Sequence, residues 1–189
     1  MNETKVRFQR FGAADARRIR TTVEYIYTGS YVDAIASGDP FDAPDTFMHR
    51  FDAYTTQATF DLVVAYVDDE PVGQTWGWPL TADNRAGWWT GLLSAPESDF
   101  THEDGKRTFA LSEIMVRREY TGRRIAHAMH DKLLSTRPER RATLLVEPDN
   151  ETAYRAYRHW GWRTVTQLRP DWPDAPLFDV MTLPLPLTQ

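Results

Sequence analysis

A single carboxylate, Glu113, interrupts an apolar segment that spans residues 110–116. The segment has the length and composition of a buried strand, and Glu113 alternates with Leu111 and Met115, so these side chains share one face. Among apolar neighbours a carboxylate has a raised pKa unless it is paired. Such a group is suited to act as a general base, directly or through water. A structural ion pair with a nearby arginine is the alternative interpretation.

A short basic turn follows this strand and leads into a helix. Gly122 lies in the turn, and Ile125, Met129 and Leu133 mark the buried stripe of the helix. Backbone N–H groups of such a turn, with the positive end of the helix dipole, bind pyrophosphate groups. Four arginines add charge: Arg117, Arg118, Arg123 and Arg124. The pattern predicts a phosphate-bearing cofactor beside an acid–base site, as in a transferase. A helix start capped by a basic loop is the plainer alternative.

Strands and helices alternate along the chain in the order of an α/β protein. Strands are expected at 6–11, 60–67, 72–79, 109–116, 142–146, 162–168 and 178–183. Helices are expected at 13–27, after an N-cap at Asp45, after the turn at Gly122, and at 151–159. Segment 30–44 is predicted to be loop or broken helix. Segment 81–108, which contains Trp88 and Trp89, is a long irregular insert, and connections of that length are often lids or binding loops.

Composition limits the classes of function. The 189 residues are expected to form one domain, and the formal net charge of -5 argues against general binding to nucleic acid or to an anionic membrane. The chain has no cysteine, which excludes disulfides and thiol catalysis. It also has no apolar leader or membrane-spanning run, so a cytoplasmic protein is expected. His127 and His130 stand three residues apart on a helix, but without a third ligand we expect no metal.

Two motifs resemble those of the GNAT superfamily of acyl-CoA-dependent N-acetyltransferases. One, V-x-x-x-Y-x-G-x-x-I-A, is met by Val116, Tyr120, Gly122, Ile125 and Ala126. The other, N-x-x-A-x-x-x-Y-x-x-x-G-W, is met by Asn150, Ala153, Tyr157, Gly161 and Trp162. The resemblance is clear over residues 109–183, rests on element order and the predicted hairpin over 6–80, and is absent over the insert.

This resemblance implies a fold, and it assigns a function to each part of the chain. The fold is α/β (α+β in some schemes), a single domain with a mixed, mostly antiparallel twisted sheet flanked by helices. A V-shaped splay is expected between the strands at 109–116 and 142–146. Residues 1–80 would form the acceptor side, 81–108 the insert, and 109–183 the half that binds acetyl-CoA.

The resemblance also assigns roles to residues. The backbone of Ile114, Met115 and Val116 would bind the pantetheine arm of acetyl-CoA as an added strand does. Tyr157 would protonate the leaving sulfur, with core packing as the alternative. Asn150 would be a helix N-cap, a CoA contact or both. The pyrophosphate would be held by Gly122, Arg123, Arg124, Ile125, Ala126 and His127. The chain departs from the family at Thr121, where Gln or Arg is usual, and at Arg124, where Gly is usual.

The implied activity is direct transfer of an acetyl group from acetyl-CoA to a primary amine of a small molecule. Acetylation of a protein N-terminus or lysine, and a non-catalytic CoA-binding domain, are the alternatives. The Trp-rich insert favours a closed small-molecule pocket. Acidic residues predict a cationic acceptor, namely Asp33, Asp39, Asp42, Asp45, Glu97, Asp99, Glu103 and Asp104. The last apolar strand could exchange between the subunits of a homodimer.

Overall fold

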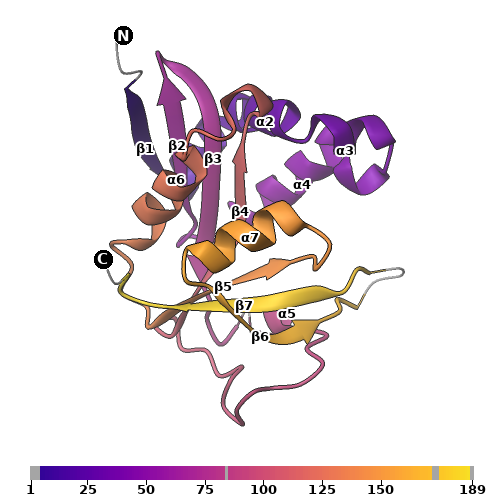
Figure 1. The fold of residues 1–189 in the computed structure, drawn as a ribbon. Coiled ribbons are helices and arrows are strands. Elements are labelled where there is room, and N and C mark those ends of the chain that lie inside the picture. Colours follow the sequence, from indigo (N-terminus) through magenta and orange to yellow (C-terminus); the bar gives the residue numbers. More distant parts are fainter. Residues whose placement is uncertain (1–4, 84, 172–174, 188–189) are drawn as a thin grey trace. The chain divides into compact units, whose positions relative to one another are not determined.

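The computed structural model describes residues 5–83, 85–171 and 175–187. Its strands are β1 (Val6–Gly12), β2 (Asp61–Val67), β3 (Glu70–Pro79), β4 (Thr108–Val116), β5 (Arg141–Val146), β6 (Arg163–Leu168) and β7 (Phe178–Pro184). They form one seven-stranded sheet in the order β1-β2-β3-β4-β5-β7-β6 (Figure 1). β4 and β5 are parallel, whereas β1–β2, β2–β3, β5–β7 and β6–β7 are antiparallel. The predicted class, α/β with a mixed and mostly antiparallel sheet, is confirmed.

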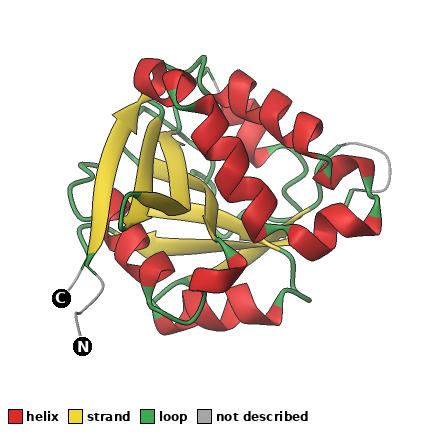
Figure 2. Cartoon of the chain, turned by 90° about the horizontal axis from the view of Figure 1, so that it is seen from above, coloured by secondary structure: helices red, strands yellow, loops and turns green. Residues whose placement is uncertain are grey.

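The helices are α1 (Ala13–Arg18), α2 (Arg20–Ser30), α3 (Val32–Ser37), α4 (Pro44–Tyr54), α5 (Arg85–Trp89), α6 (Ile125–Leu134) and α7 (Glu151–His159). Two short 3₁₀ turns, η1 (Pro40–Asp42) and η2 (Arg118–Tyr120), complete the set. Figure 2 shows the helices in red and the strands in yellow. Among the described residues, no helix is both long and apolar enough to span a bilayer.

Contacts divide the chain into two compact units. The first comprises residues 1–78 and 113–133, and the second comprises residues 79–112 and 134–189. The boundary falls inside β4, between Ser112 and Glu113. The functional division into 1–80, 81–108 and 109–183 remains a prediction, because the contacts group the chain differently. The turn at Gly122 and most of α6 belong with the N-terminal strands.

In the first unit, the two faces of β3 carry different helices. A Cβ at Gly73 would lie 2.9 Å from the methyl carbon of Met129, so this face of β3 lies against α6. The side-chain amide of the next residue, Gln74, donates to the carbonyl of Val23 on α2 at 3.1 Å. Because successive residues of a strand face opposite sides, α6 covers one face of the sheet and α2 the other (Figure 1).

The core of this unit is aromatic. The rings of Tyr27 and Phe47 stack with centroids 3.7 Å apart. Phe47, Phe51 and Phe60 surround the fully buried Trp76 at centroid distances of 5.7, 5.4 and 6.0 Å. These residues come from α2, α4, the position just before β2, and β3, so the cluster fixes the helices against the sheet. The hairpin of β2 and β3 turns at Asp68 and Asp69, whose φ values of 48° and 66° are those of a type I′ turn.

Two helix predictions for the first unit need correction. Segment 13–27 is two helices rather than one, because the backbone breaks at Ile19, with φ -100° and ψ 24°. No Gly or Pro signals this break. Asp45 is not the N-cap of α4: Ala43 is, and Pro44 occupies the first helical position, where its missing N–H costs nothing. Asp45 lies in the first turn and suits the helix dipole there.

Segment 30–44 was predicted to be loop or broken helix, and the structure shows a broken helix. It contains α3 and η1. Gly38 ends α3 in the left-handed conformation with φ 80°, and the Asp39 side chain caps η1 by accepting from the Phe41 amide at 2.9 Å.

In the second unit, β5 lies between β4 and β7. β4 pairs with β5 through Thr108, Phe109 and Ala110, opposite Arg141, Ala142 and Thr143. The predicted splay of the two strands beyond this point remains a prediction. β7 pairs with β5 and β6 of its own chain, and α7 begins directly after its N-cap, Asn150.

The insert is anchored inside the second unit. Leu92 forms a bridge with Leu168 of β6, and Gly91 is required beside it, because a Cβ there would lie 1.8 Å from the Arg169 carbonyl oxygen. Trp89 is buried and donates its ring N–H to Glu103 at 3.1 Å, and Glu103 also pairs with Arg141 of β5 at 3.3 Å. The insert is therefore fastened to the sheet rather than a loose loop.

Candidate active site

Glu113 lies in the first unit, near the end of β4. Its main-chain carbonyl accepts a hydrogen bond from the Thr75 hydroxyl of β3 at 2.8 Å, which fixes the backbone at this residue. Burial of the carboxyl raises its pKa to about 7, and the positive charge of Arg50 on α4 offsets part of that increase. Among the described residues none forms an ion pair with Glu113, so the structural ion pair considered from the sequence is not found. A carboxyl titrating near neutrality is able to accept a proton and release it again.

The end of β4 leaves one edge available for an added strand. The amide of Arg117 donates to the Val72 carbonyl of β3 at 2.8 Å. Adjacent residues of a strand direct their N–H and C=O groups to opposite edges, so Val116 and, two residues earlier, Ile114 direct theirs away from β3. Pairing with β5 on that side covers only residues 108–110 of β4. An extended ligand is therefore able to pair with these backbone groups.

The turn before α6 presents backbone N–H groups without acceptors. Within the described part of the chain, the amides of residues 122–126 have no hydrogen-bond acceptor, while the Arg124 carbonyl accepts from Ala128 at 3.1 Å to begin the helix. Gly122 has φ 75°, and a Cβ there would meet no atom within 4 Å, so the space beside it is open. Unpaired amides at a helix start bind anions, and these residues fit a pyrophosphate.

Arg124 adopts the backbone conformation that glycine usually supplies. Its φ is 60°, in the left-handed region, and its side chain is exposed. The family pattern has Gly at this position, and the structure gives the reason: the turn requires a positive φ there whichever residue is present. An arginine in this conformation costs roughly 1 kcal/mol of strain relative to glycine.

The four arginines of the turn are not equally available. Arg117 is buried and pairs with Glu70 and Glu119, both at 2.6 Å, and Arg118 pairs with Asp33. Arg123 folds back to donate to the Glu119 carbonyl at 3.2 Å. Arg124 has no ion-pair or hydrogen-bond partner for its side chain among the described residues. Two of the four positive charges expected from the sequence are thus neutralised, and Arg124 is the cation whose side chain is open among the described residues.

Glu70 holds the segment before the turn, and sequence reasoning missed it. Besides Arg117, its carboxylate accepts from the Tyr120 hydroxyl at 2.7 Å and from the Tyr25 hydroxyl at 3.0 Å. These hydrogen bonds, that of Tyr120 first, lower the pKa of Glu70. Glu70 begins β3, so it ties the hairpin to η2, which directly precedes Gly122. Its sequence context shows only a turn, and 47 residues separate it from Arg117, so no local signal links the pair.

The second unit holds the other two predicted residues. Asn150 is the N-cap of α7, and its side-chain oxygen accepts from the Ala153 amide at 3.2 Å. Tyr157 is buried, and its ring packs edge-on against Trp160 and Trp162 at centroid distances of 5.7 and 6.2 Å. The N-cap role of Asn150 is therefore found in the structure. Packing accounts for where the Tyr157 ring lies, and the role of its hydroxyl stays a prediction.

The acidic residues expected to attract a cationic acceptor are partly neutralised. Four of the eight have an arginine partner: Asp33 with Arg118, Asp99 with Arg107, Glu103 with Arg141, and Asp104 with Arg140. Trp89, one of the two tryptophans of the insert, is buried inside its own unit against Phe100. The electrostatic attraction expected from the sequence is weaker than the count of carboxylates implies.

The sequence profile described as the acetyltransferase (GNAT) family matches residues 29–162. Because the match spans well over half of the chain, the chain belongs to this family. It is an acyltransferase that depends on acetyl-CoA, the acyl donor of the family. No curated protein shows significant similarity to the chain.

Solved structures resemble it in fold. An acetyltransferase from Thermus thermophilus is 12% identical with a TM-score of 0.63, and the match covers 98% of this chain and 100% of that one. The ribosomal-protein-S18-alanine N-acetyltransferase of Escherichia coli is 12% identical with a TM-score of 0.62, covering 98% and 97%. The PaiA N-acetyltransferase of Thermoplasma acidophilum, solved in complex with coenzyme A, is 10% identical with a TM-score of 0.55, covering 95% and 99%.

Proposed function

We propose that this acetyltransferase moves the acetyl group of acetyl-CoA directly to a primary amine of a small molecule. The observation that carries the proposal is Glu113, a carboxyl on β4 with a pKa of about 7 and no ion-pair partner among the described residues. A direct transfer requires a group that accepts the proton lost by the nitrogen of the attacking neutral amine, and a carboxylate whose carboxyl titrates near neutrality meets this requirement.

Glu113 acts as the general base. As the amine nitrogen bonds to the acetyl carbonyl carbon and the carbon–sulfur bond breaks, the nitrogen loses one proton, which the Glu113 carboxylate accepts directly or through water. Arg50 keeps part of the carboxyl population ionised near neutrality, because its charge lowers the pKa that burial raises.

The donor is held by backbone groups on β4 and in the turn. The edge of Ile114, Met115 and Val116 pairs with the amides of the pantetheine arm. The unpaired N–H groups of residues 122–126, together with the amide of His127, bind the pyrophosphate, and Arg124 supplies the open positive charge. Arg123 and Asn150 complete the proposed set. What supports this assignment is that the amides of residues 122–126 lack acceptors of their own among the described residues.

Tyr157 acts as the general acid. Its hydroxyl gives a proton to the sulfur as the thiolate leaves, which balances the proton taken up by Glu113. Packing against Trp160 and Trp162 holds the ring in one orientation and so fixes the position of its hydroxyl oxygen.

The acceptor class is tested by supplying acetyl-CoA with small amines and with peptides and measuring free CoA. Small primary amines should release CoA in excess of hydrolysis, basic ones more than neutral ones, and Glu113→Gln should abolish the excess. Peptides acetylated at the N-terminus or at lysine, with small amines inert, would establish the alternative activity. Binding of acetyl-CoA without turnover of any acceptor would favour a non-catalytic domain.

A further inference from the structure

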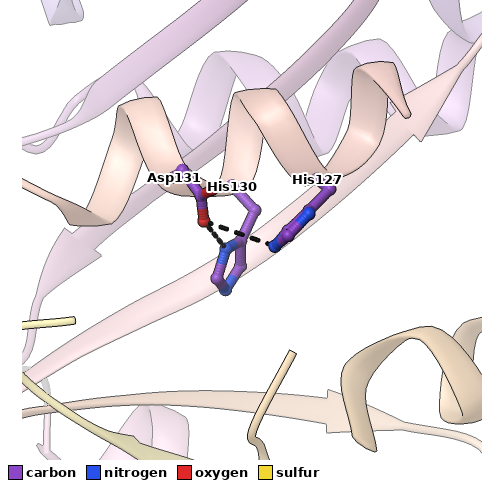
Figure 3. A group of neighbouring side chains, drawn as sticks. All are labelled: His127, His130 and Asp131. Carbon is purple, nitrogen blue, oxygen red and sulfur yellow. Dashed lines mark hydrogen bonds and ion pairs between the residues drawn. The ribbon is translucent and has the colours of Figure 1, made fainter. Parts of the chain in front are cut away.

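Three potential metal ligands meet on α6, two of them half exposed and one buried. His127, His130 and Asp131 offer ligand atoms that all lie within 4.8 Å of one another, and Figure 3 shows dashed lines from the Asp131 carboxylate to both imidazoles. Asp131 Oδ1 lies 2.9 Å from His130 Nδ1 and 3.7 Å from His127 Nε2. One carboxylate oxygen therefore faces both rings.

These distances suit a tetrahedral ion. With metal–ligand bonds near 2.0–2.2 Å, two ligands of a tetrahedral Zn²⁺ are about 3.4 Å apart. The two observed separations, 2.9 and 3.7 Å, lie on either side of this value. The 2.9 Å contact is a hydrogen bond that the His130 ring donates to the carboxylate, so an ion bound there takes the place of the ring proton.

The ligand types select the metal. Two imidazole nitrogens and one carboxylate oxygen suit Zn²⁺ and its neighbours among the transition metals, whereas Mg²⁺ and Ca²⁺ prefer sites made of oxygen atoms alone. Sequence reasoning weighed His127 and His130 without a third ligand. Asp131, four residues after His127, is that ligand, because residues i and i+4 share a helix face.

We propose that His127 Nε2, His130 Nδ1 and Asp131 Oδ1 bind one Zn²⁺ ion, with water at the fourth position. His127 and Asp131 are about half exposed, at 44% and 49%, so an ion is able to reach the site and retain a water ligand. His130 is buried, which holds its ring in place beside the other two ligands.

A bound ion would join successive turns of α6 near the start of the helix. Such a link stabilises the folded chain, because binding at a site formed only in the folded state adds to its stability. The main-chain amide of His127 is untouched by coordination through its ring. The inference does not depend on acetyl transfer, and its test needs no acceptor.

The test is a titration of the full, tag-free chain with Zn²⁺ by calorimetry, and with Co²⁺ by visible absorption as a reporter of coordination number. We expect one equivalent to bind, Co²⁺ to give the intense spectrum of a tetrahedral site, and Zn²⁺ to raise the melting temperature. His127→Gln and Asp131→Asn should each weaken binding at least tenfold. Both side chains are partly exposed, so these variants should fold, as circular dichroism will show.

Matched controls are His102→Gln and His159→Gln, which remove exposed histidines elsewhere in the chain and should leave binding unchanged. Excess Mg²⁺ should not compete. Equal affinity in wild type, His127→Gln and Asp131→Asn would overturn the proposal, as would loss of binding in either control. An octahedral, weakly absorbing Co²⁺ spectrum would also refute the tetrahedral site.

Discussion

Arg117 Nη1 lies 2.6 Å from Glu70 Oε1, and this ion pair fastens the residue after β4 to the hairpin of β2 and β3. The other oxygen of Glu70 accepts from the Tyr120 hydroxyl at 2.7 Å. The Glu70 carboxylate thus holds η2 at both ends. It binds Arg117, which precedes η2, and Tyr120, which is the last residue of η2. Because η2 leads directly into the turn at Gly122, Glu70 positions the proposed pyrophosphate site without belonging to it.

We predict that Glu70→Gln weakens acetyl-CoA binding roughly fivefold, which corresponds to about 1 kcal/mol for the loss of charge-assisted hydrogen bonds. The physical reason is a less ordered turn, which must be ordered again when the cofactor binds. Calorimetric titration with acetyl-CoA measures the effect. Asp69→Asn is the matched control, since Asp69 lies next to Glu70 but forms only an exposed pair with Arg7. Equal affinity in the two variants would remove Glu70 from this role.

Local patterns in the sequence determined most of the fold prediction. The alternating strands, the stripe of Ile125, Met129 and Leu133, and the cap at Asn150 each depend on residues close in sequence, and each was found. The break at Ile19 carries no such signal, since neither Gly nor Pro marks it.

The candidate site shows the same limit. Glu113 was predictable because a carboxylate in an apolar strand is conspicuous within a few residues. Glu70 and Arg50 act on the site through tertiary contacts, and no short-range pattern shows them. The neutralisation of Arg117 and Arg118 depends on Glu70 and Asp33, which are distant in sequence, so the charge of the turn was overestimated.

Gly122 provides a prediction with an internal control. Gly122→Val should weaken acetyl-CoA binding at least tenfold, because a β-branched side chain resists φ 75° and enters the space that the ligand would need. The strain should also lower stability by roughly 1–2 kcal/mol. Gly38 has φ 80° and equally open space, but lies between α3 and η1. Gly38→Val should lose similar stability and keep its acetyl-CoA affinity; if both variants bind normally, the turn is not the cofactor site.

Arg124→Gly should stabilise the protein. The left-handed conformation at φ 60° costs arginine roughly 1 kcal/mol more than glycine, and part of this gain is lost because glycine makes the unfolded chain more flexible. A net increase of about 0.5 kcal/mol is expected in denaturant unfolding. Arg123→Gly is the control: Arg123 has no positive φ, so this variant should lose stability. A loss in both variants would show that the left-handed conformation at residue 124 is not strained.

Tyr157→Phe isolates the hydroxyl from the packing of the ring. If the hydroxyl protonates the leaving thiolate, turnover should fall by roughly 10²-fold or more, while acetyl-CoA affinity and melting temperature stay close to those of the wild type. Tyr154→Phe, one helical turn earlier, removes a hydroxyl that hydrogen-bonds Thr164 at 2.6 Å and should leave turnover near normal. Steady-state kinetics with a saturating acceptor measures both. Normal turnover in Tyr157→Phe would leave Tyr157 as a packing residue.

Glu113→Gln should change both the rate and the stability in ways that depend on pH. In the wild type, kcat/KM should rise with pH through a single limb near pH 7, because only the ionised carboxylate accepts a proton. The Gln variant should lose this limb and fall roughly 10²-fold or more.

A rise in pH has the opposite effect on stability: ionisation of the Glu113 carboxyl favours catalysis but destabilises the folded chain. Its pKa of about 7 in the folded chain lies above its ordinary value of 4.5, so between these values the folded state binds more protons than the unfolded state. Stability contributed by Glu113 is therefore present below pH 4.5 and is lost as the pH rises through 7. Relative to wild type, Glu113→Gln should become more stable between about pH 4 and pH 8 by up to about 3 kcal/mol, measured by denaturant unfolding. A difference in stability that does not vary with pH would show that Glu113 titrates near its ordinary value, and would remove the physical basis for its action as a base at neutral pH.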